Sequence, residues 1–181
     1  MCMRPTSKKI LSIAISLIFI SLVKGQTLMP KEILQISNLK TETEITNLLK
    51  EKGFDYNGYS GISRINEKED SWCFRSFSDK REIINSFVAK VTDDSHHSKI
   101  ILTLYNFYHY RDFVNNLLES KFIFKGIKTI ESINYTQNNK MEHRTYLNFT
   151  KSNLSFLTRE CIGYDSTPFY EIVFQQNNNG R

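Results

Sequence analysis

Two stretches of the chain match each other and decide the expected fold. They read Thr46-Asn47-Leu48-Leu49-Lys50-Glu51-Lys52-Gly53-Phe54-Asp55-Tyr56-Asn57-Gly58 and Asn115-Asn116-Leu117-Leu118-Glu119-Ser120-Lys121-Phe122-Ile123-Phe124-Lys125-Gly126. One deletion aligns a Leu-Leu pair, a lysine, two alternate aromatic residues and a glycine. Farther along, residues 77, 87–88 and 100–102 align with residues 149, 156–157 and 171–173. Self-similarity at a fixed spacing is typical of repeats, so we predict two degenerate copies of about 70 residues, 38–106 and 109–176.

Each copy begins with a pattern typical of a helix. In the first copy, Thr41 and Glu44 form a capping-box pair, and an apolar stripe follows until Gly53, where a helix commonly stops. In the second copy, Asp112 is the expected N-cap, before a matching stripe of Val114, Leu117 and Leu118. A short earlier helix is expected over 30–36, because Pro30 suits the first helical position.

After each helix, the apolar period changes to two, which is typical of strands. The clearest are residues 99–106 and 169–176, which are rich in β-branched and aromatic side chains. Residues 82–91 fit a helix or a strand. A strand is favoured, because the counterpart 154–161 and the polar turn after residue 91 indicate a hairpin. The predicted fold class is therefore α+β, with two degenerate repeats, each a helix followed by a three- to four-stranded antiparallel meander.

The first 25 residues are typical of a secretory signal peptide. Arg4, Lys8 and Lys9 precede an apolar run over 10–23, and Gly25 ends a cleavage-site pattern. Fourteen helical residues would rise about 21 Å, less than the roughly 30 Å of a membrane core, although an uncleaved anchor is the alternative. We expect a secreted or periplasmic protein cleaved near Gly25-Gln26. Its helix-plus-sheet units would cover 26–107 and 108–176, with a disordered tail over 177–181.

Removing the signal changes the charge of the protein. The full chain carries a net charge of +5, and the signal contains four bases and no acid, so the mature chain carries +1. Nucleic-acid binding requires clustered positive charge, which a nearly balanced chain does not provide. The expected partner is therefore not a nucleic acid, and no membrane span is expected in the mature chain.

Common catalytic and metal-binding motifs are absent from the sequence. It contains no GxGxxG, GxxxxGK[ST], HExxH or CxxC pattern, and Gly58-Tyr59-Ser60-Gly61 lacks the spacing of a serine-hydrolase elbow. Residues 93–97 read Asp-Asp-Ser-His-His, which could ligate a metal. Neighbouring residues of one turn rarely converge on an ion, so we interpret this segment as a solvated hairpin tip. We expect no metal and no cofactor.

The most aromatic stretch covers residues 105–112 and contains the candidate binding residues. Aromatic residues and arginine dominate protein interfaces, so a surface of Tyr105, Tyr108, His109, Tyr110 and Arg111 could contact a partner. In the alternative, this junction between the two copies packs Phe107 and one tyrosine into the core.

Two cysteines remain after processing, Cys73 and Cys161. In an oxidising compartment they could form a disulfide, which would stabilise the fold by about 4 kcal/mol. The alternative is two separate thiols. A hydrolase site assembled from His109, His143, Asp165 and Cys161 is a second functional hypothesis. A small-ligand carrier with a closed apolar pocket is a third.

The order of elements resembles that of secreted proteins of the β-lactamase-inhibitor-protein type, which carry tandem helix-plus-antiparallel-sheet units. The composition, rich in Ile, Asn and Lys, is similar to that of small exported proteins of Bacteroidetes. The resemblance implies a protein that binds another protein across a concave sheet surface. We therefore expect an exported, non-catalytic binding protein of inhibitor, immunity or envelope-accessory type, acting through an aromatic-rich sheet surface.

Overall fold

The structure, a computed structural model, describes residues 27–59, 67–78, 81–93, 97–134, 140–163 and 165–176. The expected signal peptide and tail lie outside these residues, as do Ser60, Gly61 and the middle of the 93–97 turn. Every side chain of the main core lies between Leu28 and Phe174. The chain from Gln26 onward therefore contains the whole of the described fold.

The described residues form an α+β fold, as predicted. The helices are α2 (Pro30–Asn38), α3 (Glu42–Lys50) and α4 (Phe107–Glu119). The strands are β1 (Phe54–Tyr59), β2 (Glu67–Ser78), β3 (Arg81–Asp93), β4 (Ser98–Leu104), β5 (Ile123–Asn134), β6 (Lys140–Lys151), β7 (Leu154–Ile162) and β8 (Pro168–Gln176).

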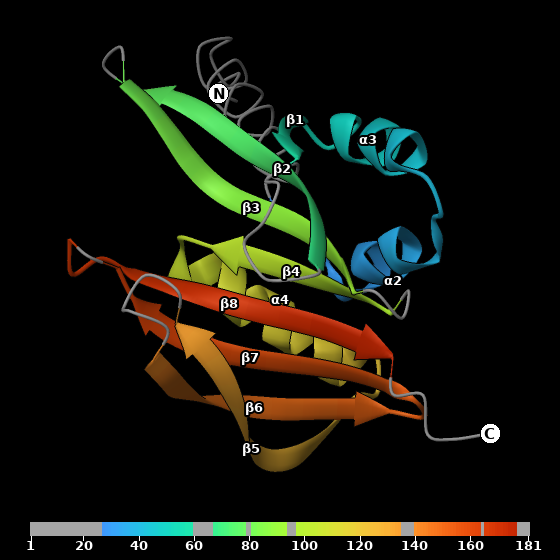
Figure 1. Ribbon diagram of the computed structural model, residues 1–181, viewed down its shortest axis with the longest axis vertical. Helices are drawn as coiled ribbons and strands as arrows, with labels where there is room; N and C mark the ends of the chain where they lie inside the picture. Colours follow the sequence, from blue (N-terminus) through green and yellow to red (C-terminus); the bar gives the residue numbers. More distant parts are fainter. Residues whose placement is uncertain are drawn as a thin grey trace, which may run out of the picture.

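The eight strands form one antiparallel sheet in the order β1-β2-β3-β4-β8-β7-β6-β5. Each half of the chain folds as a meander, and the last strands of the two meanders pair with each other (Figure 1). In that pairing, Leu102 lies opposite Ile172 and Leu104 lies opposite Tyr170. The β4–β8 ladder therefore makes one continuous sheet from two sequential halves.

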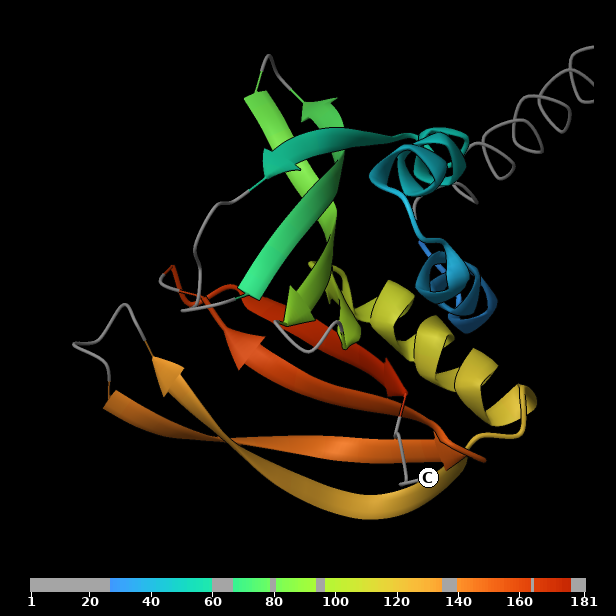
Figure 2. The same ribbon diagram turned by 45° about the vertical axis from the view of Figure 1, so that its right-hand side comes forward.

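All three helices lie on the same side of this sheet (Figure 2). Alternate residues of β4 and β8 point toward them, including Leu102, Leu104, Ile172 and Phe174, which are buried. This period of two is what places one apolar face of each strand in the core. The opposite face of the sheet has no described helix on it.

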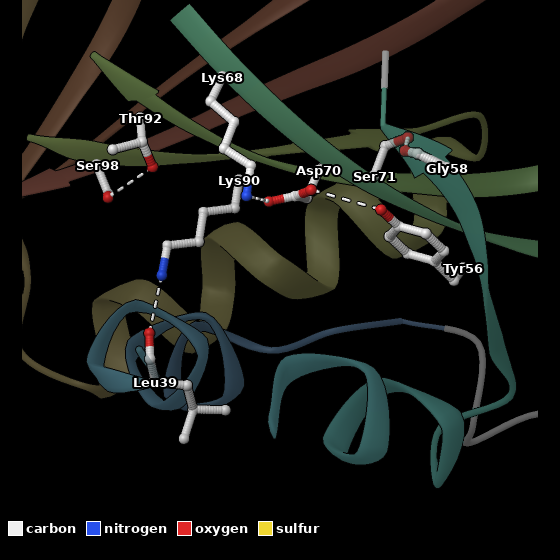
Figure 3. A network of polar contacts seen from close by, with 9 residues as sticks. All are labelled: Leu39, Tyr56, Gly58, Lys68, Asp70, Ser71, Lys90, Thr92 and Ser98. Atoms are coloured by element: carbon white, nitrogen blue, oxygen red, sulfur yellow. Dashed lines mark hydrogen bonds and ion pairs between the residues drawn. The ribbon is translucent and has the colours of Figure 1, made fainter. Parts of the chain in front are cut away.

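Polar contacts join strands to helices on the covered face (Figure 3). The Lys90 ammonium of β3 donates to the carbonyl oxygen of Leu39, the C-cap of α2, at 2.8 Å. A cation at a helix C-terminus is favourable, because it meets unpaired carbonyls and the negative end of the helix dipole. Burial lowers the pKa of Lys90, and Asp70 opposes that shift.

The first two helices agree with the sequence prediction. The Thr41 hydroxyl accepts from the Glu44 N–H at 3.2 Å, and the Glu44 carboxylate accepts from the Thr41 N–H at 3.0 Å. This is the expected capping box, and it lowers the pKa of Glu44. Gly53 follows the helix with φ of +81°, and a Cβ there would lie 2.9 Å from the Phe74 ring. Glycine is required there for both reasons.

The ambiguous segment 82–91 is a strand, as favoured, because it lies within β3 between β2 and β4. The possible disulfide is wrong: Cys73 and Cys161 are not joined by a disulfide, which leaves the alternative of two separate thiols. Cys73 lies on β2 and Cys161 on β7, with three strands between them in the sheet order. Four strand spacings of about 4.8 Å exceed the roughly 7 Å between Cα atoms that a disulfide can bridge.

The hydrogen bond between Trp72 and Thr46 generates a stability prediction. The Trp72 ring is fully buried, and its Nε1–H donates to the Thr46 hydroxyl of α3 at 2.9 Å. Thr46→Val should lower the free energy of unfolding by about 1–3 kcal/mol in urea titrations, because the indole N–H loses its acceptor. Thr46→Ser keeps the hydroxyl and should remain close to the parent. Equal stability of the two variants would contradict this role of the bond.

Candidate functional site: an aromatic patch where β4 meets α4

The helix that carries the candidate residues begins earlier than the sequence predicted. Its N-cap is Asn106, whose side-chain oxygen accepts from the Tyr108 N–H at 2.8 Å. The expected cap, Asp112, is wrong: it lies inside α4, where Arg111 contacts its carboxylate at 3.1 Å. Asparagine is as effective an N-cap as aspartate, and here it comes two residues after β4 ends. Residues 107–111 are therefore helical.

Three aromatic side chains are exposed at this junction. Tyr105 is 46% exposed, Phe107 is 53% exposed and Tyr108 is 62% exposed. Phe107 contacts Tyr108, with 6.0 Å between ring centroids, and Tyr105 contacts Phe169 at 6.1 Å. We call Tyr105, Phe107, Tyr108, Arg111 and Phe169 the aromatic patch.

The aromatic patch rests on a packed base. Tyr110 stacks on Tyr170 of β8, with ring centroids 4.4 Å apart and planes within 12°. Its hydroxyl also forms a hydrogen bond with that of Thr158, at 3.0 Å. Phe107 contacts the same Tyr170 ring at 6.0 Å. Tyr110 therefore holds α4 on the sheet, while Phe107 and Tyr108 project from it.

The two basic candidates differ in charge and position. The Arg111 guanidinium lies 5.3 Å from the centre of the Tyr108 ring, a cation–π contact at the exposed rim. His109 is partly buried, and its Nδ1 has no hydrogen-bond partner. Burial lowers the pKa of His109, and Asp112 partly offsets that shift. Burial thus favours the neutral form of His109, and the cation at the rim is Arg111, which is paired with Asp112.

Of the five predicted residues, Tyr105, Tyr108 and Arg111 lie in the aromatic patch and Tyr110 packs beneath it, whereas the Nδ1 of His109 has no partner among the described residues. The sequence treated Phe107 as a possible core residue and did not single out Phe169. The helical periodicity of α4 could have shown that Phe107 is not a core residue. Phe113 and Leu117 define the buried face of the helix, and Phe107 lies at the margin of that face. Phe169 reaches the aromatic patch through the pairing of β4 with β8, which no local pattern specifies.

The hydrolase residues lie on four separate segments: His109 on α4, His143 on β6, Cys161 on β7 and Asp165 in the β7–β8 turn. The Asp165 carboxylate accepts from the Thr167 N–H at 3.0 Å, which lowers its pKa. The Nδ1 of His109 has no hydrogen-bond partner in the part of the chain that the structure describes, so this nitrogen is not paired with the Asp165 carboxylate.

A polar cluster lies on the face of the sheet without helices. The Glu171 carboxylate accepts from the Tyr146 hydroxyl at 2.7 Å and from Arg159 Nε at 2.9 Å, and burial beside this carboxylate raises the pKa of Tyr146. Next to the cluster is a cavity of about 150 Å³, lined also by Lys99 and Arg144. Because Glu171 already has two charge-assisted partners, the cluster links β6, β7 and β8 as a structural contact.

Two other predicted features can be located. Asp93 and His97 contact each other across their turn, at 3.5 Å between Nδ1 and a carboxylate oxygen, and the described residues include no group of three or more metal-ligating side chains.

An apolar groove of about 330 Å³ lies between α2 and the β6–β7 turn. Its lining includes the exposed residues Lys31, Ser120 and Ser152, so it is open, unlike the closed pocket expected for a carrier.

Comparison with protein-family models, with curated proteins and with solved structures finds no match. Within the described residues, no helix has both the length and the apolar character needed to cross a membrane.

The division between exposed and packed tyrosines can be tested by stability. Tyr110→Ala removes the stacked ring and the bond to Thr158, and should lower the free energy of unfolding by about 3 kcal/mol. Tyr108→Ala, at an exposed position, should change it by less than about 0.5 kcal/mol. Thermal and urea unfolding of the two variants would measure this. A large loss in Tyr108→Ala would assign that ring to the core instead.

Proposed function

We propose that this chain is an exported, non-catalytic protein that binds another protein, and that the aromatic patch is its contact surface. The observation that carries the proposal is the exposure of Tyr105, Phe107 and Tyr108 beside one another at one helix N-terminus. Tyr, Phe and Arg are enriched in interfaces, where a few such residues supply most of the binding free energy. An aromatic-rich binding surface was expected on the sheet, whereas this one combines α4 with the ends of β4 and β8.

The geometry of the aromatic patch suits binding. Phe107 contacts the buried Tyr170 ring, and Tyr108 is flanked by Phe107 and Arg111, so these side chains are already ordered in the free protein. A preordered side chain loses less conformational entropy when a partner binds. A partner that covers these rings would remove apolar surface from water without first having to fix them.

We also propose that the chain consists of two degenerate repeats. This proposal is supported by the order of elements, because in each half of the chain a helix is followed by four antiparallel strands. The first strand of each half contains a bulge that ends at a glycine: Gly58 with φ of +105° and Gly126 with φ of +107°. Since bulges of this kind depend on a specific glycine, two at matching places favour duplication. This element order underlies the resemblance to inhibitor-type secreted proteins.

Affinity capture with paired variants tests the binding function. The mature chain, residues 26–181, would be immobilised and exposed to the envelope fraction of its own host, and a stoichiometric protein is expected to bind. Phe107→Ala with Tyr108→Ala should weaken that binding at least about tenfold, because both exposed rings are lost. Leu118→Ala is the matched control, since Leu118 is 50% exposed on the same helix.

Three outcomes would contradict the proposal: no protein partner, equal loss in the control, or full binding by the double variant. Recovery of a small molecule alone would instead favour the carrier.

Export has its own test. Expression of the full chain in a bacterial host with a secretion pathway should release a protein that begins at Gln26, because the apolar run over 10–23 is short for a membrane span. Intact-mass measurement and N-terminal sequencing of the exported fraction would identify that end. Recovery of the uncleaved chain in the membrane fraction would show that residues 1–25 act as an anchor.

A further inference from the structure

A second exposed surface lies at the far end of α4, where β5 begins. Residues 121–130 read Lys-Phe-Ile-Phe-Lys-Gly-Ile-Lys-Thr-Ile, with three lysines and no acid. Ile123 is 60% exposed, Phe124 is 49% exposed and Ile127 is 71% exposed. The mature chain is almost neutral overall, so this stretch concentrates both positive charge and exposed apolar area.

The backbone of β5 puts two of these side chains on one face. Phe124 pairs with Phe149, and a bulge then brings Gly126 opposite Asn148 and Ile127 opposite Leu147. Without the bulge, Phe124 and Ile127 would point to opposite faces, because side chains alternate along a strand. Phe149 belongs to the main core, so Phe124, Ile127 and Leu147 share the face that carries the helices.

At the opposite end of the sheet, the corresponding apolar side chains are covered. α3 packs on β1 and β2, and Phe54 and Trp72 are buried beneath it. α4 instead packs on β4 and β8 at the centre of the sheet. Phe124, Ile127 and Leu147 therefore stay exposed on an outermost strand pair, β5–β6 (Figure 1).

We propose that this face docks onto an anionic lipid surface. Its apolar contact would be Phe124, Ile127 and Leu147, and its basic rim would be Lys121 and Lys125, which are exposed just before β5 and in its bulge. Lys128 pairs with Tyr146 and points to the other face of the same edge strand. Apolar side chains enter the boundary between headgroups and acyl chains, while lysines beside them reach anionic headgroups. Glu119 and Glu131 flank the stretch at its two ends, so the positive charge beside the apolar side chains is centred on Lys121 and Lys125.

The composition favours lipid over a protein partner. Lysine is depleted in protein interfaces, whereas its long apolar stem and terminal charge suit a membrane interface. Lysines on an edge strand also discourage strand-to-strand aggregation. Protection against aggregation explains the lysines but not the exposed Ile123, Phe124 and Ile127 beside them. An edge strand that served only this purpose would carry polar residues at those positions.

Vesicle sedimentation tests the proposal directly. The chain from Gln26, which contains the whole described fold, would be mixed with vesicles of phosphatidylglycerol and phosphatidylcholine or of phosphatidylcholine alone. We expect sedimentation with the anionic vesicles, weakening as salt is raised, and at least about tenfold weaker partitioning into neutral vesicles.

Two double variants and one matched control assign the binding to this face. Lys121→Glu with Lys125→Glu, and separately Phe124→Ser with Ile127→Ser, should each reduce partitioning at least about tenfold. Lys40→Glu with Lys50→Glu changes the net charge equally, before and within α3, and should partition like the parent. Near-ultraviolet circular dichroism and thermal melting would verify that every variant folds.

Several results would overturn the proposal. One is absence of sedimentation with anionic vesicles, and another is unchanged partitioning of both double variants. A third is an oligomer in solution that only the Phe124→Ser, Ile127→Ser variant disrupts, which would assign the face to a second copy of the chain. The proposal is independent of the aromatic patch, so Phe107→Ala with Tyr108→Ala should leave vesicle binding unchanged.

Discussion

The pairing of β4 with β8 is the interaction on which the rest of the structure depends. It is the ladder that joins the two meanders, and it aligns Lys99–Leu104 with Tyr170–Gln175 in one antiparallel register. Ile100, Leu102, Ile172 and Phe174 are buried along it, beneath the helices. Because side chains alternate along both strands, a shift of either strand by one residue would turn its two buried side chains to the other face.

That register also positions the functional candidates. Leu104 lies opposite Tyr170, so the residue after β4, Tyr105, reaches Phe169, and Tyr170 is placed beneath Tyr110 and Phe107. The aromatic patch thus collects residues more than 60 positions apart in the sequence. On the other face, the same strand presents Glu171 to Tyr146 and Arg159, which ties β8 to the strands beyond it. One ladder therefore supports two different side-chain clusters.

Local patterns predicted the elements well and their meeting points less well. The capping box at Thr41 and the alternation in 99–104 act through neighbouring residues, so the sequence shows them directly. The start of α4 was placed six residues late, because Asp112 fitted the second repeat while Asn106 was overlooked. Whether Cys73 and Cys161 could form a disulfide depends on their distance across the sheet. That distance follows from the strand order, which local sequence patterns do not show. Whether the five candidate residues bind a partner stays a prediction; packing shows that Tyr110 is structural and that Phe107 and Phe169 lie with the exposed rings.

Because no disulfide joins Cys73 to Cys161, the fold forms without a covalent cross-link between them. No covalent link joins distant parts of the described chain, so native contacts alone select the strand order. Such a chain needs neither an oxidant nor a disulfide isomerase to reach its folded state. Its folded state is therefore compatible with a reducing cytoplasm as well as with an oxidising envelope.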